Sequence, residues 1–453
     1  MNSTLARLLG GLLCVLLLSP RGAQAQFKLL RSGGAADLSA ESLQKLVETL
    51  ASDDMQGRAL HTKANAAADF IASEFGKAGL QPLPNQSSFD QVFPLFQVRS
   101  LSVAAQLNGA PLPAGQAVLI SGQPEVSWSS AAGQPHPKLL RIGERAQPRS
   151  FYDSIFNAKT DLLVLVHPAQ EKWFKSLASR FNNSSYRYSP TRPAARTTVL
   201  LLTDQLTPSS YQVQGRSQVG TVQVRNIAGM LPGRNPAHTN EEVVFGAHYD
   251  HLGYLPPVEG DSIANGADDD ASGTAAVIAL AHYYKKRHDN ARTLIFVAFT
   301  AEEVGEYGSA YFAEKLPDPT RVAAMFNLEM LGMPSKFGPG TAFITGFDKT
   351  NFGKILQRNL QGSRSRFEPD PYPDQQLFAR SDNYKLARRG IAAHTISTVQ
   401  LPTDQYYHSV DDEPSTLDFQ NMSAVVNAIA QGARTIVAGT DTPTRLQPDP
   451  KYK

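Results

Sequence analysis

Histidines and acidic residues recur in short groups in the second half of the chain, and such side chains can bind metal ions or move protons. Each group follows an apolar segment typical of a buried strand. Taken singly, each has an ordinary explanation as a hydrogen-bonded or helix-capping residue. Their shared position at strand ends favours one common site, because open α/β sheets bind ligands beyond the carboxyl ends of their strands. The groups at strand ends comprise His248 and Asp250, Glu302 and Glu303, Glu329, and His408.

Three adjacent aspartates, Asp268, Asp269 and Asp270, stand in a loop bounded by Gly266 and Gly273. Neighbouring carboxylates repel one another, and a bound dication removes that cost. Two zinc ions about 3.5 to 4 Å apart need one bridging carboxylate and further His, Asp or Glu ligands on each side. The loop can supply such a bridge. From these residues alone, a calcium-binding loop or an acidic surface loop remains an alternative.

Glu302 and Glu303 form an adjacent pair of carboxylates after the apolar segment 293–299. Consecutive residues of an extended segment point to opposite sides. One carboxylate can therefore bind a metal while the other takes a proton from water that the metal has made more acidic. This division of labour is typical of hydrolytic chemistry.

A repeated order of strand, loop and helix begins near Val222 and positions these groups. The order predicts an α/β fold with a mostly parallel mixed sheet and helices on both faces. Earlier in the chain we expect two helices between residues 39 and 79 and a strand over 89–98. The expected strands of the second half are 243–245, 293–299, 322–328, 342–345 and 391–396, and the expected helices are 274–287, 310–316 and 419–437.

The composition changes along the chain and predicts several parts. Residues 100–220 are rich in Gln, Ser and Pro with scattered apolar runs, which indicates an inserted, smaller α+β accessory domain. Residues 26–99 would be the N-terminal part of the main domain, 221–440 its catalytic part, and 441–453 a loosely held tail.

The first 25 residues are typical of a removable export signal, with a short polar start at Arg7, an apolar core and the small-x-small sequence Ala23-Gln24-Ala25. The apolar core is too short to span a bilayer, so we expect no membrane anchor and an exported protein, periplasmic or extracellular in a bacterium. The single cysteine, Cys14, lies in this segment. The mature chain would then have neither disulfides nor thiolate ligands, and any metal must bind to His, Asp and Glu.

The charges nearly balance, with 43 basic and 41 acidic residues spread along the 453-residue chain. This pattern argues against nucleic acid or an anionic membrane as a partner, because both require a one-sided basic surface. The oligomeric state is left open.

Six motifs in order resemble those of the co-catalytic dizinc peptidases, a family that includes secreted bacterial aminopeptidases, glutamate carboxypeptidase, glutaminyl cyclases and the metal-free transferrin receptor. The resemblance covers about residues 222–437, with a weaker similarity in SDDMQGR (52–58). The motifs are GAHYDHLG (246–253), NGADDDASG (265–273), TAEEVGEYGS (300–309), NLEMLG (327–332), RSDNY (380–384) and YYHSVDDEP (406–414).

The resemblance implies a role for each matching residue. His248 and Glu329 would be terminal ligands of one zinc ion, Glu303 and His408 of the other, and Asp269 the bridge. Glu302 would be the general base, and Tyr407 would stabilise the oxyanion. Asp250, which would orient the ring of His248, and Asp270 are expected behind the ligands, and the peptide bond between Asp269 and Asp270 would be cis.

The implied function is that of a secreted exopeptidase with two Zn²⁺ ions per chain, in the first place an aminopeptidase that acts on peptides or small proteins. Alternatives are a glutaminyl cyclase-like acyltransferase with one zinc ion, a carboxypeptidase of the same fold, and a non-catalytic binding protein. Glu329 departs from the family, in which many members have Asp, so the geometry of this ligand is the first to check.

Other polar residues have weaker signals. We expect His251 and His282 to be structural, and Arg380 and Asp382 either to shape the substrate pocket or to cap a helix. The region 100–220 occupies the place where some family members carry a protease-associated domain, although its sequence matches that domain poorly.

Overall fold

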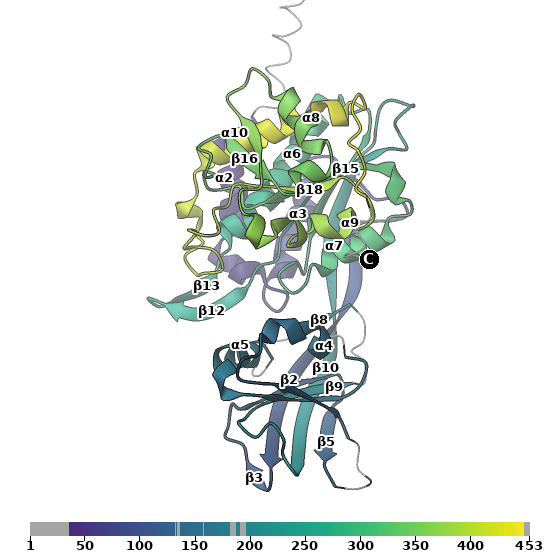
Figure 1. The fold of residues 1–453 in the computed structure, drawn as a ribbon. Coiled ribbons are helices and arrows are strands. Elements are labelled where there is room, and N and C mark those ends of the chain that lie inside the picture. Colours follow the sequence, from purple (N-terminus) through teal and green to yellow (C-terminus); the bar gives the residue numbers. More distant parts are fainter. Residues whose placement is uncertain are drawn as a thin grey trace, which may run out of the picture.

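A computed structural model describes residues 36–447 except 132, 134, 135, 157, 182–186 and 191–195. The predicted export signal, residues 1–25, and the end of the predicted tail lie outside the described residues. Two bodies are visible, a large one with helices packed on a sheet and a smaller one, joined by two long strands (Figure 1).

A mixed sheet forms the centre of the large body. Its strand order is β17-β16-β18-β15-β11-β14-β10-β2-β3. The pairs of β11 with β14, β11 with β15 and β15 with β18 are parallel, whereas β10 and β2 continue the sheet in antiparallel pairs. The main strands are β2 (Asp90–Leu107), β10 (Tyr211–Leu231), β11 (Glu242–His248), β14 (Thr293–Phe299), β15 (Val322–Glu329), β16 (Thr341–Ile344), β17 (Arg366–Pro369) and β18 (Ala393–Ser397).

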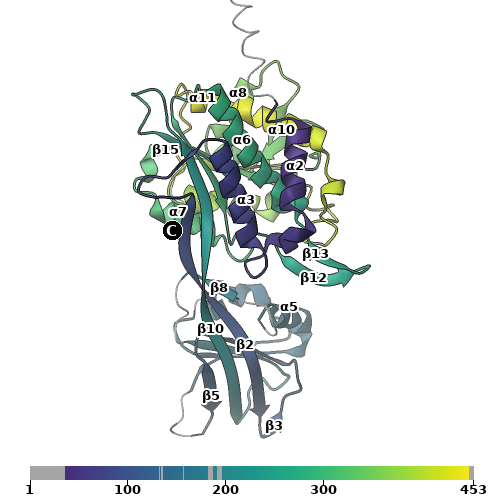
Figure 2. The same cartoon turned by 180° about the vertical axis from the view of Figure 1, so that it is seen from behind.

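Helices cover both faces of this sheet, so the predicted α/β fold is confirmed. The helices α2, α3, α6, α8, α10 and α11 pack on one face, and α7 and α9 pack on the other. Figure 2 shows α2, α3 and α6 together on the first face. The helices are α2 (Ala40–Leu50), α3 (Ala64–Lys77), α6 (Gly273–Arg287), α7 (Tyr307–Lys315), α8 (Phe352–Asn359), α9 (Asn383–Ala387), α10 (Phe419–Gly432) and α11 (Arg434–Val437).

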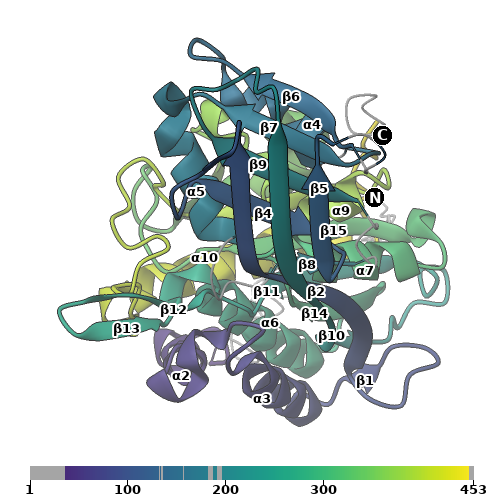
Figure 3. The same ribbon diagram turned by 90° about the horizontal axis from the view of Figure 1, so that it is seen from below.

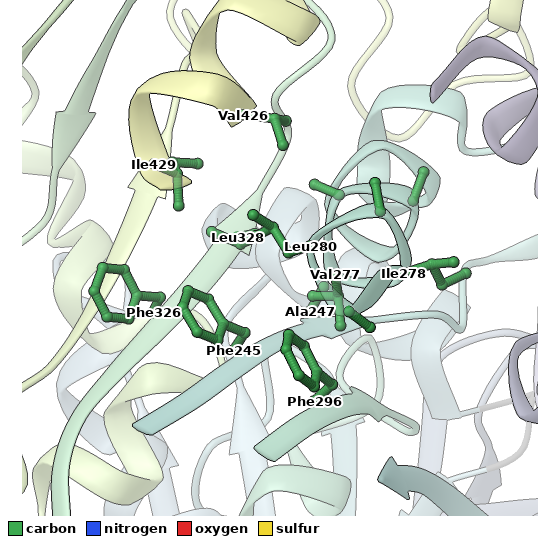
Figure 4. Packing of buried hydrophobic residues seen from close by; sticks show 14 of the residues in the cluster. Phe245, Ala247, Val277, Ile278, Leu280, Phe296, Phe326, Leu328, Val426 and Ile429 are labelled. Carbon is green, nitrogen blue, oxygen red and sulfur yellow. The ribbon is translucent and has the colours of Figure 1, made fainter. Parts of the chain in front are cut away.

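Strand periodicity explains how one short apolar segment serves two cores. Phe245 of β11 points into the core under α6, whereas its neighbour Val244 belongs to the cluster under α7 and α9. On the first face, Phe245 stacks on Phe296 of β14 and Phe326 of β15, with ring centroids 5.6 and 4.8 Å apart (Figure 4). These aromatic pairs hold the three strands in register just below their carboxyl ends.

Helix ends follow local sequence signals. The side chain of Ser39 accepts a hydrogen bond from the N–H of Ser42 and caps α2, and Asp418 caps α10 in the same way through Asn421. The single helix expected over 419–437 is in fact two, α10 and α11, because the helix is interrupted at Ala433.

A second sheet of order β4-β9-β7-β6 belongs to the smaller body (Figure 3). Its strands are β4 (Ala117–Ser121), β6 (Lys138–Ile142), β7 (Leu162–Val166) and β9 (Thr197–Leu202), and two helices, α4 (Tyr152–Phe156) and α5 (Glu171–Phe181), accompany them. The smaller body also contains β3 (Ala110–Pro111) and β5 (Glu125–Ser129), while β8 (Arg187–Ser189) pairs with β2 and β1 (Gln81–Pro82) pairs with β10 in the large sheet.

The strands β2 and β10 run through both bodies as one antiparallel ladder, from Asp90 paired with Ile227 to Leu107 paired with Tyr211. The boundaries expected at 99 and 221 therefore fall inside two continuous strands. The sequence obscured this, because polar residues such as Arg99, Ser100 and Gln218 interrupt the apolar pattern where the strands are half exposed. Alternation signals a strand only when one face is buried.

The described part of the predicted loose tail is held in place. Asp441 and Thr442 bind the buried side chain of Arg292, and the side chain of Arg445 binds carbonyl oxygens of Pro319 and Val322. The prediction of a loosely held tail is therefore wrong for residues 441–447. It rested on the Pro and Lys content of the segment, which does not reveal such contacts. Within the described part of the chain, none of the helices has the length and apolar character needed to cross a bilayer.

Candidate metal centre

The carboxyl ends of three parallel strands bring the candidate residues to one edge of the sheet. His248 is the last residue of β11 and Glu329 the last of β15. Glu302 and Glu303 follow β14, and Asp269 lies in the turn before α6. His408 comes from the long loop between β18 and α10.

We call His248, Asp269 and Glu329 the inner cluster. The Nε2 atom of His248 lies 3.2 Å from Oδ1 of Asp269 and 3.3 Å from Oε1 of Glu329. Nδ1 of His248 lies 3.0 Å from the carbonyl oxygen of Asp250, so Nδ1 must carry the proton and Nε2 is free to bind an ion. The hydroxyl of Ser381 donates to Oε2 of Glu329 at 2.6 Å and leaves Oε1 facing the histidine.

We call Asp269, Glu303 and His408 the outer cluster. Nε2 of His408 lies 3.2 Å from Oδ2 of Asp269 and 3.3 Å from Oε2 of Glu303. The two oxygens of Asp269 therefore face different histidines, which is the arrangement of a bridging carboxylate. In both clusters the histidine nitrogen lies 3.2 and 3.3 Å from the two carboxylate oxygens, close to the distance expected for two atoms about 2.0 Å from a tetrahedral ion.

The loop that carries Asp269 is held by hydrogen bonds to its backbone. The peptide bond between Asp269 and Asp270 is cis, as expected. The carboxylate of Asp412, four residues after His408, accepts hydrogen bonds from the N–H groups of Asp268 and Asp269 at 2.8 and 3.0 Å. The two loops that supply the bridge and the outer histidine are thereby tied together.

The carboxylates of Asp270 and Asp250 accept hydrogen bonds from backbone N–H groups behind the two clusters. Oδ1 of Asp270 accepts hydrogen bonds from the N–H groups of Gly273 and Met330, both at 3.0 Å. The carboxylate of Asp250 does not orient the ring of His248, because it accepts the N–H of Glu302 at 3.1 Å. The ring is oriented by the carbonyl oxygen of Asp250 instead. The motif spacing could not distinguish these two acceptors of one residue.

Charges in the site attract a cation. Burial alone would lower the pKa of His248, but Glu329 and Asp269 hold this pKa well above its usual value. The pKa of His408 is likewise lowered by burial and raised by hydrogen bonds to Asp269 and Glu303, to about 10. Burial raises the pKa of Glu302 well above its usual value, with a further contribution from Glu303. A raised pKa makes this carboxylate a stronger base than an exposed glutamate.

Residues 226–433 match the family model described as peptidase family M28. Among similar proteins, leucine aminopeptidase 1 of Ajellomyces capsulatus (strain H88) is 32% identical over 204 residues, which are 41% of this chain and 50% of that protein. A probable leucine aminopeptidase of Arthroderma otae is 28% identical over 205 residues, 44% of this chain and 52% of that protein. The chain spans about half the length of these relatives.

Two solved structures share the fold over most of the chain. An aminopeptidase from Aneurinibacillus sp. strain AM-1 has a TM-score of 0.56 at 18% identity and covers 92% of this chain and 97% of its own. A zinc aminopeptidase from Bacillus subtilis has a TM-score of 0.56 at 17% identity, with 88% and 95% covered. The likeness extends beyond the M28 segment and includes the smaller body.

Left-handed backbone occurs beside the candidate ligands. Ala301, Met330 and His408 have φ values of 59°, 50° and 57°. Ala301 precedes Glu302, and Met330 follows Glu329. Such conformations cost free energy in residues other than glycine and gather at functional sites, where the surrounding structure enforces them.

Arg58 lies behind the candidate site, and the sequence did not reveal its role. Its side chain is fully buried and donates to carbonyl oxygens of Leu50, Tyr249, Asn265 and Gly266 at 2.8, 2.8, 2.5 and 2.8 Å. The guanidinium thus joins α2, the end of β11 and the aspartate loop. The weak similarity of residues 52–58 to the family was the only signal.

A small, largely apolar cavity lies beside the inner cluster. Tyr407 lies in the cavity wall and stacks on His408 with ring centroids 3.9 Å apart. Arg380 lines the cavity, whereas the carboxyl group of Asp382 is buried and makes no capping bond to α9. The apolar part of the lining consists of Met330, Phe343, Leu377, Val399 and Leu401.

The two histidines expected to be structural differ in their surroundings. His282 lies away from both clusters, with Nε2 3.5 Å from a carboxylate oxygen of Glu74 on α3. His251, in contrast, is buried beside the outer cluster, with Nδ1 2.8 Å from Oε1 of Glu303.

Proposed function

We propose that the protein is a zinc-dependent exopeptidase, in the first place an aminopeptidase. The observation that carries this proposal is Asp269, whose two oxygens face the inner and the outer cluster separately. In the proposal, the inner cluster holds one zinc ion, the outer cluster holds a second, and Asp269 bridges them. Glu329, although longer than the aspartate common in relatives, reaches ligand spacing from His248.

The ligand chemistry supports zinc over calcium. Each cluster joins an imidazole nitrogen to carboxylate oxygens, and imidazole is a ligand for zinc and other transition metals. Calcium takes six to eight oxygen ligands instead. The alternative of a calcium loop, which the aspartate run alone left open, therefore loses its support.

Glu302 is the general base in this proposal. When bound, zinc supplies Lewis acidity, which polarises a substrate carbonyl and lowers the pKa of water. Glu302 accepts a proton from the attacking water and returns it to the leaving amine, a role for which its raised pKa is suited. Tyr407, whose ring stacks on His408, would stabilise the oxyanion with a hydrogen bond from its hydroxyl group.

The charge pattern favours a substrate with a free amino terminus. Carboxylates surround the site, whereas recognition of a free carboxylate requires an available cation. Of the described cations near the site, Arg58 is fully used by carbonyl groups and Lys385 pairs with Glu306 at 3.0 Å. Arg380 at the cavity is the feature that keeps a carboxypeptidase as the alternative. The apolar cavity, and the leucine aminopeptidase names of relatives, support a substrate with an apolar terminal residue.

The test is to assay metal-stripped and zinc-reloaded protein on reporters for amino-terminal and carboxy-terminal cleavage, with Glu302→Gln as a matched variant. We expect zinc-dependent cleavage of a leucyl reporter, and a rate about 10²- to 10⁴-fold lower in the variant at unchanged zinc content. Absence of chelator-sensitive cleavage at either terminus would contradict an exopeptidase.

Metal counting addresses the remaining rivals. A glutaminyl cyclase-like protein would hold one zinc ion per chain instead of the two proposed, and it would cyclise amino-terminal glutamine. A non-catalytic binding protein would keep its biological effect in the Glu302→Gln variant.

A further inference from the structure

We propose that His251 is a positioning residue for Glu303, which it holds with one carboxylate oxygen turned toward the outer metal ion. This inference rests on the proposed zinc site. Residue order and spacing did not distinguish His251 from the other histidines. In the fold, His251, Asp269 and Glu303 lie close enough together to hold an ion, so His251 is either a ligand itself or a residue that orients Glu303.

The distances distinguish a hydrogen-bond donor from a ligand. Nδ1 of His251 lies 2.8 Å from Oε1 of Glu303, the length of a charge-assisted N–H···O hydrogen bond. It lies 3.9 Å from Oδ2 of Asp269, farther than the spacing of about 3.3 Å between ligands of one tetrahedral ion. His408, by contrast, is 3.2 and 3.3 Å from both carboxylates. The carboxylate of Glu303 is thus divided, with Oε1 bound to His251 and Oε2 at ligand distance from His408.

The ring of His251 has little freedom to leave this position. Its side chain is 0% exposed. A Cβ atom on Gly266 would lie 2.5 and 2.6 Å from Cδ2 and Cγ of the ring, so the aspartate loop closes on it and glycine is required there. On another side the ring meets His408 edge to face, with centroids 5.9 Å apart.

The remaining ring nitrogen, Nε2, is buried and has no hydrogen-bond partner among the described residues. Burying a polar atom without a partner costs free energy. The ring keeps this buried position although Nε2 has no partner, while Nδ1 is bonded to Glu303. We infer that the functional contact is the one made by Nδ1.

Loss of this contact should weaken binding of the outer ion and leave binding of the inner ion nearly unchanged. Without the donor, Glu303 can rotate, and one of its oxygens is no longer presented at ligand distance. Groups that orient a metal ligand typically contribute 10- to 100-fold in metal affinity. The inner cluster shares only Asp269 with the outer one, and His251 lies 3.9 Å from Oδ2 of Asp269, the oxygen that faces the outer cluster. Affinity for the first ion should therefore stay within about twofold.

The experiment compares His251→Ala, His251→Asn and His238→Asn in the full-length protein. An asparagine amide can replace Nδ1 as a donor to Glu303 but is a poor zinc ligand. His238 is a matched control, because its Nδ1 also faces a glutamate, Glu241, at 3.2 Å on a distant part of the surface. Zinc affinity at each site is measured by competition with a chromophoric chelator, together with the thermal unfolding of the metal-free protein.

We expect His251→Ala to lower the weaker zinc affinity about 10- to 100-fold, His251→Asn to restore most of it, and His238→Asn to change neither affinity. If both His251 variants lost the second ion equally, His251 would be a ligand and the inference would be overturned. Unchanged zinc affinities in His251→Ala would overturn it too. A wild-type protein that binds no second zinc would instead contradict the proposed function, so the two failures are distinguishable.

Discussion

The inner and outer clusters use the same chemical groups but are built with different rigidity. In the inner cluster His248 is 1% exposed, and both its histidine and its glutamate end buried parallel strands. In the outer cluster His408 is 36% exposed and comes from a long loop. Only Asp269 belongs to both.

This difference concerns what holds each ligand in place. The inner ligands are fixed by strand pairing and by two hydrogen bonds, one that His248 donates to the carbonyl oxygen of Asp250 and one that Ser381 donates to Glu329. The outer histidine depends on its loop, which Asp412 ties to the aspartate turn. A ligand on a strand is pre-organised, whereas a ligand on a loop must be ordered during binding. We therefore expect the inner ion to bind more tightly than the outer one.

The largest effect should come from Asp269→Asn, which removes the group common to both clusters. We expect loss of bound zinc from both sites and loss of all chelator-sensitive activity. Zinc content per chain after gel filtration, measured by elemental analysis, tests this. If the variant kept one tightly bound ion, the two clusters would be independent and the bridge would be refuted.

The next effect concerns the support behind both clusters. Arg58→Met leaves buried carbonyl oxygens unpaired, so the free energy of unfolding of the metal-free protein should fall by about 3 to 5 kcal/mol. Zinc affinity should fall with it, because the aspartate loop loses its anchor. Denaturant unfolding and chelator competition measure the two quantities.

Arg292→Met is the control for this change. Arg292 is also buried and binds the carbonyl oxygens of Ile436 and Asp441, away from the site. We expect it to lower stability while zinc affinity of the folded protein stays unchanged. Equal losses of affinity in both variants would show that Arg58 acts only through global stability.

Removing one histidine at a time should separate the clusters. His408→Ala should lose the outer ion and keep the inner one, whereas His248→Ala should reduce binding at both sites, because the tighter ion also fixes Asp269. A calorimetric titration with zinc resolves the two binding steps. Loss of the inner ion and retention of the outer one in His408→Ala would contradict the expectation that the inner ion binds more tightly.

The smallest effect is a pH dependence of the metal-free protein. The folded pKa of His408, about 10, lies above the usual 6.5, so the resulting stabilisation is complete below pH 6.5 and is lost as pH rises toward 10. We expect about 1 kcal/mol or less, because His408 is partly exposed and solvent screens the pair. The difference in unfolding temperature between wild type and His408→Asn, followed from pH 7 to 9, isolates this contribution. Equal slopes in both proteins would contradict it.

The fold could be predicted where the residues of a segment themselves determine its secondary structure. Continuous apolar runs such as 293–299 coincide with their strand, since a buried parallel strand needs apolar side chains on both faces. The long ladder of β2 and β10 escaped prediction, because half-exposed strands carry polar residues that break the alternation. The break between α10 and α11 at Ala433 likewise had no clear local signal.

The candidate site divides in the same way. The candidates His248, Asp269, Glu302, Glu303, Glu329 and His408 were predicted from their residue types, from the meeting of strand ends at one edge of the sheet, and from the resemblance of their motifs to a known family. Which oxygen or nitrogen of each residue faces which partner depends on loop paths and ring rotations. Asp250 acts through its carbonyl, His251 through Nδ1 and Arg58 through carbonyl groups distant in sequence. Such contacts exist only after folding brings these segments together, which is why residue identity alone could not specify them.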